Sequence, residues 1–133
     1  NFLSQIKLKN NIFLAKGDGW SCHESKIVTL WFKGYLYGSS IEALFKKICV
    51  VRKNSTLTIN ACASLIIDLK GHFAVVIESD NFVFASVDKV RSIPIYYTEH
   101  KSIRIVGDHA PSLADLVRCS GKGSKKWARA PMS

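Results

Sequence analysis

The sequence predicts an α+β layered domain, in which stacked and largely antiparallel sheets carry helices on their outer faces. Residues 72–79 and 81–88 are apolar at nearly every position, which is typical of strands covered on both faces. Residues 41–48 and 62–69 instead place apolar side chains at the i, i+3, i+4 spacing of a helix with one buried face. Several strands and few helices favour sheets that pack on each other.

The N-terminal part of the chain has the pattern of strands and turns. Residues 4–15 are predicted to form a hairpin, because two apolar segments flank the turn residues Asn10 and Asn11. Residues 16–26 are polar and contain glycine, which predicts a loop or a short irregular strand pair. Residues 27–37 are rich in β-branched and aromatic side chains and predict a strand.

A first helix is predicted over residues 40–49. Either Ser39 or Ser40 can cap its start, and Glu42 stands three residues after Ser39, as in a capping box. The basic segment at residues 51–56 is expected to be a loop.

A second helix is predicted over residues 61–70, with Gly71 as its C-terminal cap. Residues 92–98 and 102–108 have the pattern of two further short strands. The segment 112–117 predicts a last helix that begins at Ser112.

The length of 133 residues fits one domain, which we place at residues 1–119, followed by a basic and flexible tail at 120–133. The chain contains no apolar run of 18 residues and no signal-peptide pattern, so we expect a cytoplasmic protein without a membrane contact. Cys49 and Cys62 fall at apolar helical positions, which indicates free thiols. Cysteine and histidine spacings predict no metal site, and no cofactor is expected.

The net charge of +9 raises the alternative of a nucleic-acid-binding protein. Its contacts would come from the basic residues of the tail, which lie close to Trp127, and from four basic residues near the first helix. The tail residues are Lys122, Lys125, Lys126 and Arg129, and the others are Lys46, Lys47, Arg52 and Lys53. A solvated basic surface explains the same charge, so nucleic acid is not the favoured partner.

Three stretches together carry a resemblance to a known family. They are "FKGYLYGSSIEALFKKI" (32–48), "DLKGHFAVVIESDNFVFASVDKVRSIPIYY" (68–97) and "IVGDHAPSLADL" (105–116). In this order and spacing they resemble the glutaminase domain of class II glutamine amidotransferases, as in the N-terminal domain of asparagine synthetase-like proteins. The resemblance implies the N-terminal nucleophile hydrolase fold, an αββα sandwich of two stacked antiparallel sheets with flanking helices.

The resemblance also implies a degenerate active site. The family begins with a catalytic cysteine, whereas this sequence begins with Asn1. Lys33 stands where the family has the asparagine of its oxyanion hole, and Gly34 matches the glycine beside it. Losing one oxyanion donor alone costs about 10²–10³ in rate. The acidic segment that binds glutamine in the family has no counterpart between Ser55 and Gly71.

The resemblance therefore implies a pseudoenzyme. It would be a binding or scaffold module for an ATP-dependent synthetase-type partner, or a fragment of such a protein. The predicted partner is a synthetase-type protein or a second copy of the same chain. Asp88 is expected to make structural hydrogen bonds. A second alternative is a cysteine-dependent amidohydrolase that uses Cys22 beside His23. Neighbours on a strand point to opposite faces, so these two side chains are not expected to pair. For Lys33, the alternative is a side chain that extends from an edge strand into water.

Overall fold

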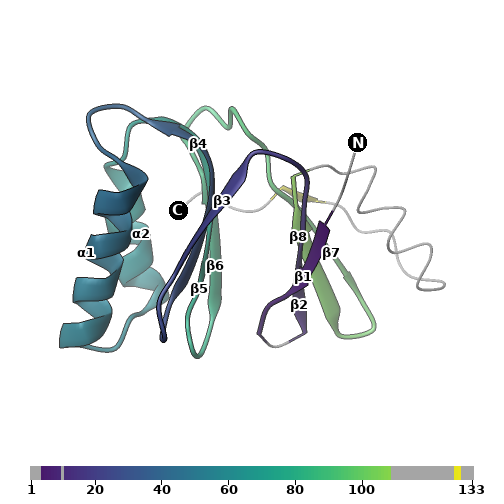
Figure 1. Ribbon diagram of the computed structural model, residues 1–133. Helices are drawn as coiled ribbons and strands as arrows, with labels where there is room; N and C mark the ends of the chain where they lie inside the picture. The colour runs from purple at the N-terminus through teal and green to yellow at the C-terminus, as the bar shows by residue number, and fades with distance from the viewer. Residues whose placement is uncertain (1–3, 10, 109–127, 130–133) are drawn as a thin grey trace.

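The computed structural model describes residues 4–9, 11–108 and 128–129, which form strands and two helices (Figure 1). The strands of the first part are β1 (Ser4–Lys7), β2 (Ile12–Lys16), β3 (Trp20–Glu24) and β4 (Thr29–Leu36). The helices α1 (Ile41–Asn54) and α2 (Ile59–Ile67) follow. The later strands are β5 (Gly71–Glu78), β6 (Val83–Val87), β7 (Tyr96–His100), β8 (Ile103–Gly107) and β9 (Ala128–Arg129).

The strands form two sheets, as the sequence predicts. One sheet has the order β3-β4-β5-β6 and is antiparallel throughout. The other has the order β1-β2-β8-β7-β9, in which only the β2–β8 pair is parallel. The predicted hairpin of residues 4–15 is the β1–β2 pair, and the ambiguous segment 16–26 contains β3, which pairs with β4.

The described residues form three layers, with α1 and α2 on one face of the four-stranded sheet and the second sheet on its other face (Figure 1). Alternating residues of β5 belong to two separate cores. Phe73, Val75 and Ile77 pack with the helices, whereas Ala74 and Val76 pack between the sheets. The nearly continuous apolar sequence of this strand therefore reflects burial on both faces.

Helix α1 begins at one of the two predicted caps but ends later than predicted. Its N-cap is Ser40, whose hydroxyl oxygen accepts a hydrogen bond from the Ala43 N–H at 3.1 Å, so the capping box of Ser39 and Glu42 is wrong. The helix also continues to Asn54, through the segment expected to be a loop. Val51 explains the extension, because it packs against the core and adds one more apolar turn.

The predicted glycine cap of the second helix is also wrong. Helix α2 ends at Ile67 with Asp68 as its C-cap, and Gly71 is the first residue of β5. A Cβ at Gly71 would lie 2.2 Å from the carbonyl oxygen of Tyr35, so glycine is required there by the contact between β4 and β5.

Part of the predicted architecture lies outside the described residues. This holds for the helix at 112–117, and so for any helical layer on the five-stranded sheet. Of the predicted tail 120–133, only Ala128 and Arg129 are described, and they pair with β7 as β9. Within the described part of the chain, neither helix has the length and apolar character needed to cross a membrane.

Candidate functional site

Lys33 lies partly buried between the two sheets and is held by an ion pair. Its strand, β4, is hydrogen-bonded to β3 on one side and β5 on the other, so it is not an edge strand. The Lys33 Nζ atom lies 2.7 Å from Oδ2 of Asp108, which directly follows β8 in the other sheet. The Asp108 side chain is 4% exposed and that of Lys33 is 28% exposed. The ion pair therefore connects the two sheets.

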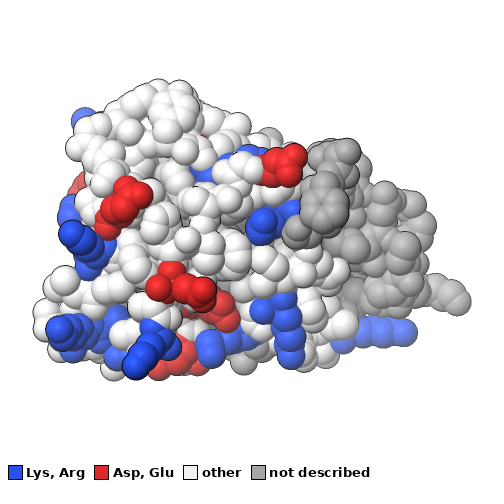
Figure 2. All heavy atoms as spheres, viewed as in Figure 1, with Lys and Arg blue, Asp and Glu red and all other residues white. Residues whose placement is uncertain are grey.

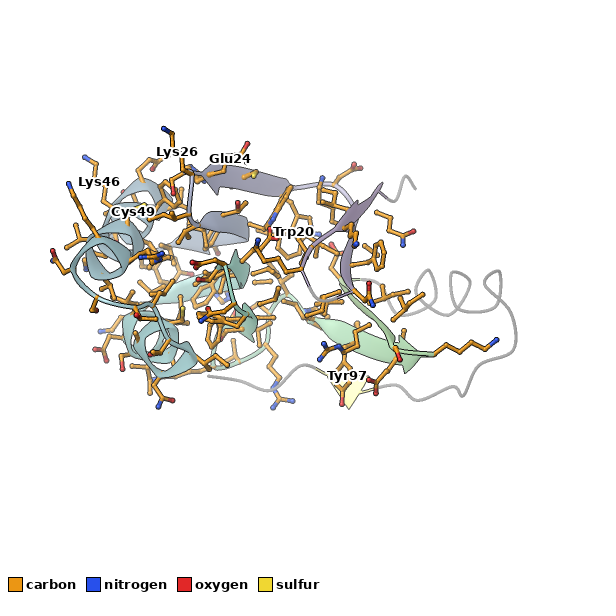
Figure 3. All side chains as sticks on the ribbon, turned by 90° about the horizontal axis from the view of Figure 1, so that it is seen from below. Trp20, Glu24, Lys26, Lys46, Cys49 and Tyr97 are labelled. Carbon is orange, nitrogen blue, oxygen red and sulfur yellow. The ribbon has the colours of Figure 1, made fainter. Side chains whose placement is uncertain are left out.

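Two further donors complete the surroundings of the Asp108 carboxylate. The indole Nε1 of Trp20 donates to Oδ2 at 3.0 Å, and the backbone N–H of Gly17 donates to Oδ1 at 3.2 Å. Figure 3 shows Trp20 where the two sheets meet. Burial would raise the pKa of Asp108, but the hydrogen bonds from Lys33 and Trp20, together with the Lys33 charge, outweigh it and hold this pKa below its ordinary value.

Gly34 lies where β4 and β5 approach each other closely. Its φ is +110°, and an added Cβ would lie 1.9 Å from the carbonyl oxygen of His72 on β5. Gly34 is the register partner of Phe73, so the two backbones approach where these strands meet. Lys33 and Gly34 thus have separate structural roles, one between the sheets and one between neighbouring strands.

Cys22 and His23 lie on opposite faces of β3, as expected. Cys22 is exposed, and burial of part of its surface together with the charge of Glu24 raises the pKa of its thiol. The His23 ring lies against Phe45 of α1, with ring centroids 5.8 Å apart, and its Nε2 is 3.7 Å from Glu42. A thiol that has a raised pKa and whose neighbouring histidine points to the other face of the strand is a poor nucleophile.

Asp88 makes the structural hydrogen bonds that its position predicts. Its side chain accepts hydrogen bonds from the backbone N–H groups of Phe73, Val90 and Ser92 at 2.8 to 3.1 Å. Burial would raise the pKa of this carboxyl, but these hydrogen bonds lower it below its ordinary value. Asp88 therefore joins β5 to the loop that follows β6.

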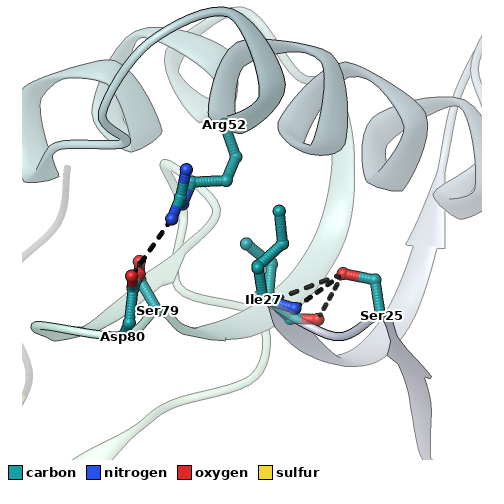
Figure 4. Close-up of polar contacts among 6 residues, drawn as sticks. Ser25, Ile27, Arg52, Ser79 and Asp80 are labelled. Carbon is teal, nitrogen blue, oxygen red and sulfur yellow. Dashed lines mark hydrogen bonds and ion pairs between the residues drawn. The ribbon is translucent and has the colours of Figure 1, made fainter.

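The structure places some of the basic residues of the alternative nucleic-acid site, and others lie outside the described residues. Arg52 is paired with Asp80, with Nη2 and Oδ2 3.1 Å apart (Figure 4). Lys46 points away from α1 into solvent (Figure 3). Basic and acidic side chains are interspersed on the face that Figure 2 shows. The side chains of Lys122, Lys125, Lys126 and Arg129 lie outside the described residues.

The structure also brings together three aromatic rings that sequence reasoning missed, and we call Tyr35, Tyr37 and His72 the aromatic surface. The ring centroids of Tyr35 and Tyr37 are 5.3 Å apart. The His72 ring centroid lies 5.4 Å from that of Tyr35 and 5.6 Å from that of Tyr37. Tyr35 and His72 are register partners across β4 and β5. The Tyr-Leu-Tyr alternation could have indicated an exposed pair of tyrosines, but His72 joins them only through the strand register.

Two hollows adjoin the aromatic surface. The first has a volume of about 310 Å³, and its lining includes Tyr37, Lys70, His72, Lys89 and Val90. The second has a volume of about 400 Å³ and is lined in part by Tyr37, Lys47 and Lys70. Tyr37 and Lys70 border both. Among the described residues, no group of three or more His, Cys, Asp or Glu side chains is arranged to hold a metal ion.

Comparisons of the chain with protein-family models, curated proteins and solved structures each gave no significant match. The resemblance to class II amidotransferases therefore rests on the quoted residues alone. What the structure defines is an α+β protein with two stacked sheets, an interior Lys33–Asp108 ion pair and an exposed aromatic surface.

Proposed function

We propose that this chain is a non-catalytic, glutaminase-like domain of the class II amidotransferase type. It acts as a binding or scaffold module for an ATP-dependent synthetase-type partner, or belongs to such a protein. The two stacked sheets support the fold that the resemblance implies. The proposal includes a second helical layer, supplied by residues 112–117, and a cytoplasmic location.

The Lys33–Asp108 ion pair is the observation that carries this proposal. The resemblance places an oxyanion-stabilising donor at position 33, but the Lys33 amine is engaged by a carboxylate at 2.7 Å. An oxyanion that formed beside this pair would meet the negative charge of Asp108, which opposes its stabilisation. The side chain at position 33 therefore stabilises the sandwich and does not serve acyl transfer.

The amidohydrolase alternative receives less support. Cys22 would need a nearby base, and His23 projects toward α1 from the opposite face of β3. The raised pKa of Cys22 also lowers the fraction of reactive thiolate at neutral pH.

Glutamate release from millimolar glutamine tests the catalytic half of the proposal. We expect the purified chain to release glutamate no faster than buffer, and the Cys22→Ala variant to behave identically. Cys22→Ala is a suitable control, since this side chain is exposed and its replacement leaves both cores intact. Glutamate release that Cys22→Ala abolishes would overturn the proposal and establish the amidohydrolase.

Complex formation tests the binding half. We expect the chain to co-elute with a co-expressed synthetase-type domain in size-exclusion chromatography with light scattering. A chain that elutes alone as a dimer would instead support the homo-oligomer.

A further inference from the structure

The aromatic surface presents ring faces to solvent. Tyr35 and Tyr37 are 55% and 52% exposed, although both lie beside other rings. The Tyr37 hydroxyl donates a hydrogen bond to the Tyr35 hydroxyl at 3.3 Å, and this hydrogen bond is the main cause that raises the pKa of Tyr37. Tyr37 is therefore uncharged at neutral pH and does not repel an anion. A planar ring can stack on such faces whatever its identity.

Lysines surround the same rings. Lys70 borders both hollows, Lys89 borders the first and Lys47 borders the second. None of these three has an ion-pair partner among the residues that the structure describes. Asp68 borders both hollows and opposes part of this charge, whereas the Asp88 carboxylate in the first hollow is already engaged by backbone N–H groups. A polyanion can therefore bring phosphates to three unpaired cations.

The arrangement of the hollows favours a strand over a single nucleotide. The two volumes, about 310 and 400 Å³, meet at Tyr37 and share Lys70. Each is within the range of small-ligand sites and is lined in part by Tyr37, so a nucleotide in either hollow can contact this side chain. An acidic peptide would also contact the lysines, but it would not generally supply successive planar groups for the rings.

We propose that the aromatic surface binds single-stranded nucleic acid, with bases stacked on Tyr35 and Tyr37 and phosphates contacted by Lys47, Lys70 and Lys89. The shared chemistry is a base that carries a phosphate. This site lies on the folded domain and not on the tail, and it shares only Lys47 with the α1 residues that the sequence pattern indicates. It does not depend on the proposed amidotransferase relationship.

Fluorescence anisotropy with a labelled 12-nucleotide oligo(U), using the full chain, tests the proposal. We expect Tyr35→Ala/Tyr37→Ala to weaken binding by about fivefold or more, because stacking contributes about 1–3 kcal/mol per base. The matched control is Tyr97→Ala, which removes a 40% exposed tyrosine from β7 in the other sheet and should leave binding unchanged. Circular dichroism of each variant establishes that it is folded.

Salt dependence separates stacking from charge. Lys70→Gln and Lys89→Gln should each reduce the slope of log affinity against log salt by about one, whereas the tyrosine double variant should keep the wild-type slope. Lys26→Gln, an exposed lysine between β3 and β4, is the charge-matched control.

Three outcomes would overturn the proposal. Equal losses of oligonucleotide affinity for Tyr97→Ala and for the double variant would show that the aromatic surface is not the binding site. Competition by AMP as strong as that of the oligonucleotide, at equal nucleotide concentration, would assign the surface to a free nucleotide. Competition by poly-glutamate as strong as that of the oligonucleotide would assign it to an acidic protein.

Discussion

At residue 34 the backbone of β4 passes so close to β5 that any side chain would meet a carbonyl group. A Cβ there would lie 1.9 Å from the His72 oxygen, and the φ of +110° is itself unfavourable for a residue with a side chain. We expect Gly34→Ala to lower the free energy of unfolding by about 3 kcal/mol or more, since the obstruction is backbone. Urea denaturation measures this loss.

Gly38 provides the matched control for this substitution. It also has a positive φ, +68°, but a Cβ built on it would meet no atom within 4 Å. Gly38→Ala should therefore cost only the conformational strain, about 1 kcal/mol. Equal losses at positions 34 and 38 would show that the strand contact is less close than described.

At the scale of single elements, Ser40 determines where α1 begins. Its side chain accepts a hydrogen bond from the Ala43 N–H, which otherwise has no partner within the helix. Ser40→Ala should lower the free energy of unfolding by about 1 kcal/mol, and Ser40→Asn should preserve it. Thermal unfolding of both variants, with Ser39→Ala as the control, measures the effect. A larger loss for Ser39→Ala than for Ser40→Ala would restore the predicted capping box.

The elements that the sequence predicts correctly are those whose signal is local. β5 could be predicted because almost every residue is apolar, and α1 because Leu44 and Ile48 repeat at helical spacing. The end of α1 could not be located from its basic residues, because Val51 packs against a core to which strands distant in the sequence also contribute. Local composition does not predict such tertiary contacts.

The candidate sites depend on pairings that periodicity does not encode. Tyr35 meets His72 only through the register of β4 and β5, and Lys33 meets Asp108 across 75 positions of the chain. The parallel β2–β8 pair joins residues that are still further apart in the sequence, as Ile12 and Arg104 are. The family resemblance drew attention to Lys33 and Gly34, but it indicated neither the buried carboxylate nor the aromatic surface.

For the whole molecule, the Lys33–Asp108 pair links two sheets that also meet through apolar side chains and through the contact of Lys16 Nζ with the Trp31 ring. The pair joins β4 to the end of β8, and Trp20 of β3 donates to the same carboxylate. Removing one partner of such a pair leaves the other charge without compensation in a partly buried place. The relative position of the sheets therefore depends on a carboxylate that must stay ionised.

Asp108→Asn tests this dependence. We expect it to lower the free energy of unfolding by about 2–3 kcal/mol at pH 7, less than for a fully buried pair, because the Lys33 side chain is 28% exposed. Asp80→Asn, which breaks the exposed Arg52–Asp80 pair, should lower the free energy of unfolding much less, because water screens this pair.

The pH dependence of the free energy of unfolding tests the role of the Asp108 charge more directly than one measurement at pH 7. The folded-state pKa of Asp108 lies below its ordinary value, so the ionised carboxylate contributes stability that is fully present above the unfolded pKa of about 3.9. This contribution is lost as the pH falls through the folded pKa, and the Asn variant lacks it at every pH. Urea denaturation between pH 3 and 7 measures the free energy of unfolding of both proteins. The difference in this free energy between wild type and Asp108→Asn should become smaller below about pH 4. A difference that stayed constant across this range would mean that Asp108 stabilises the sandwich through its shape and hydrogen bonds and not through its charge.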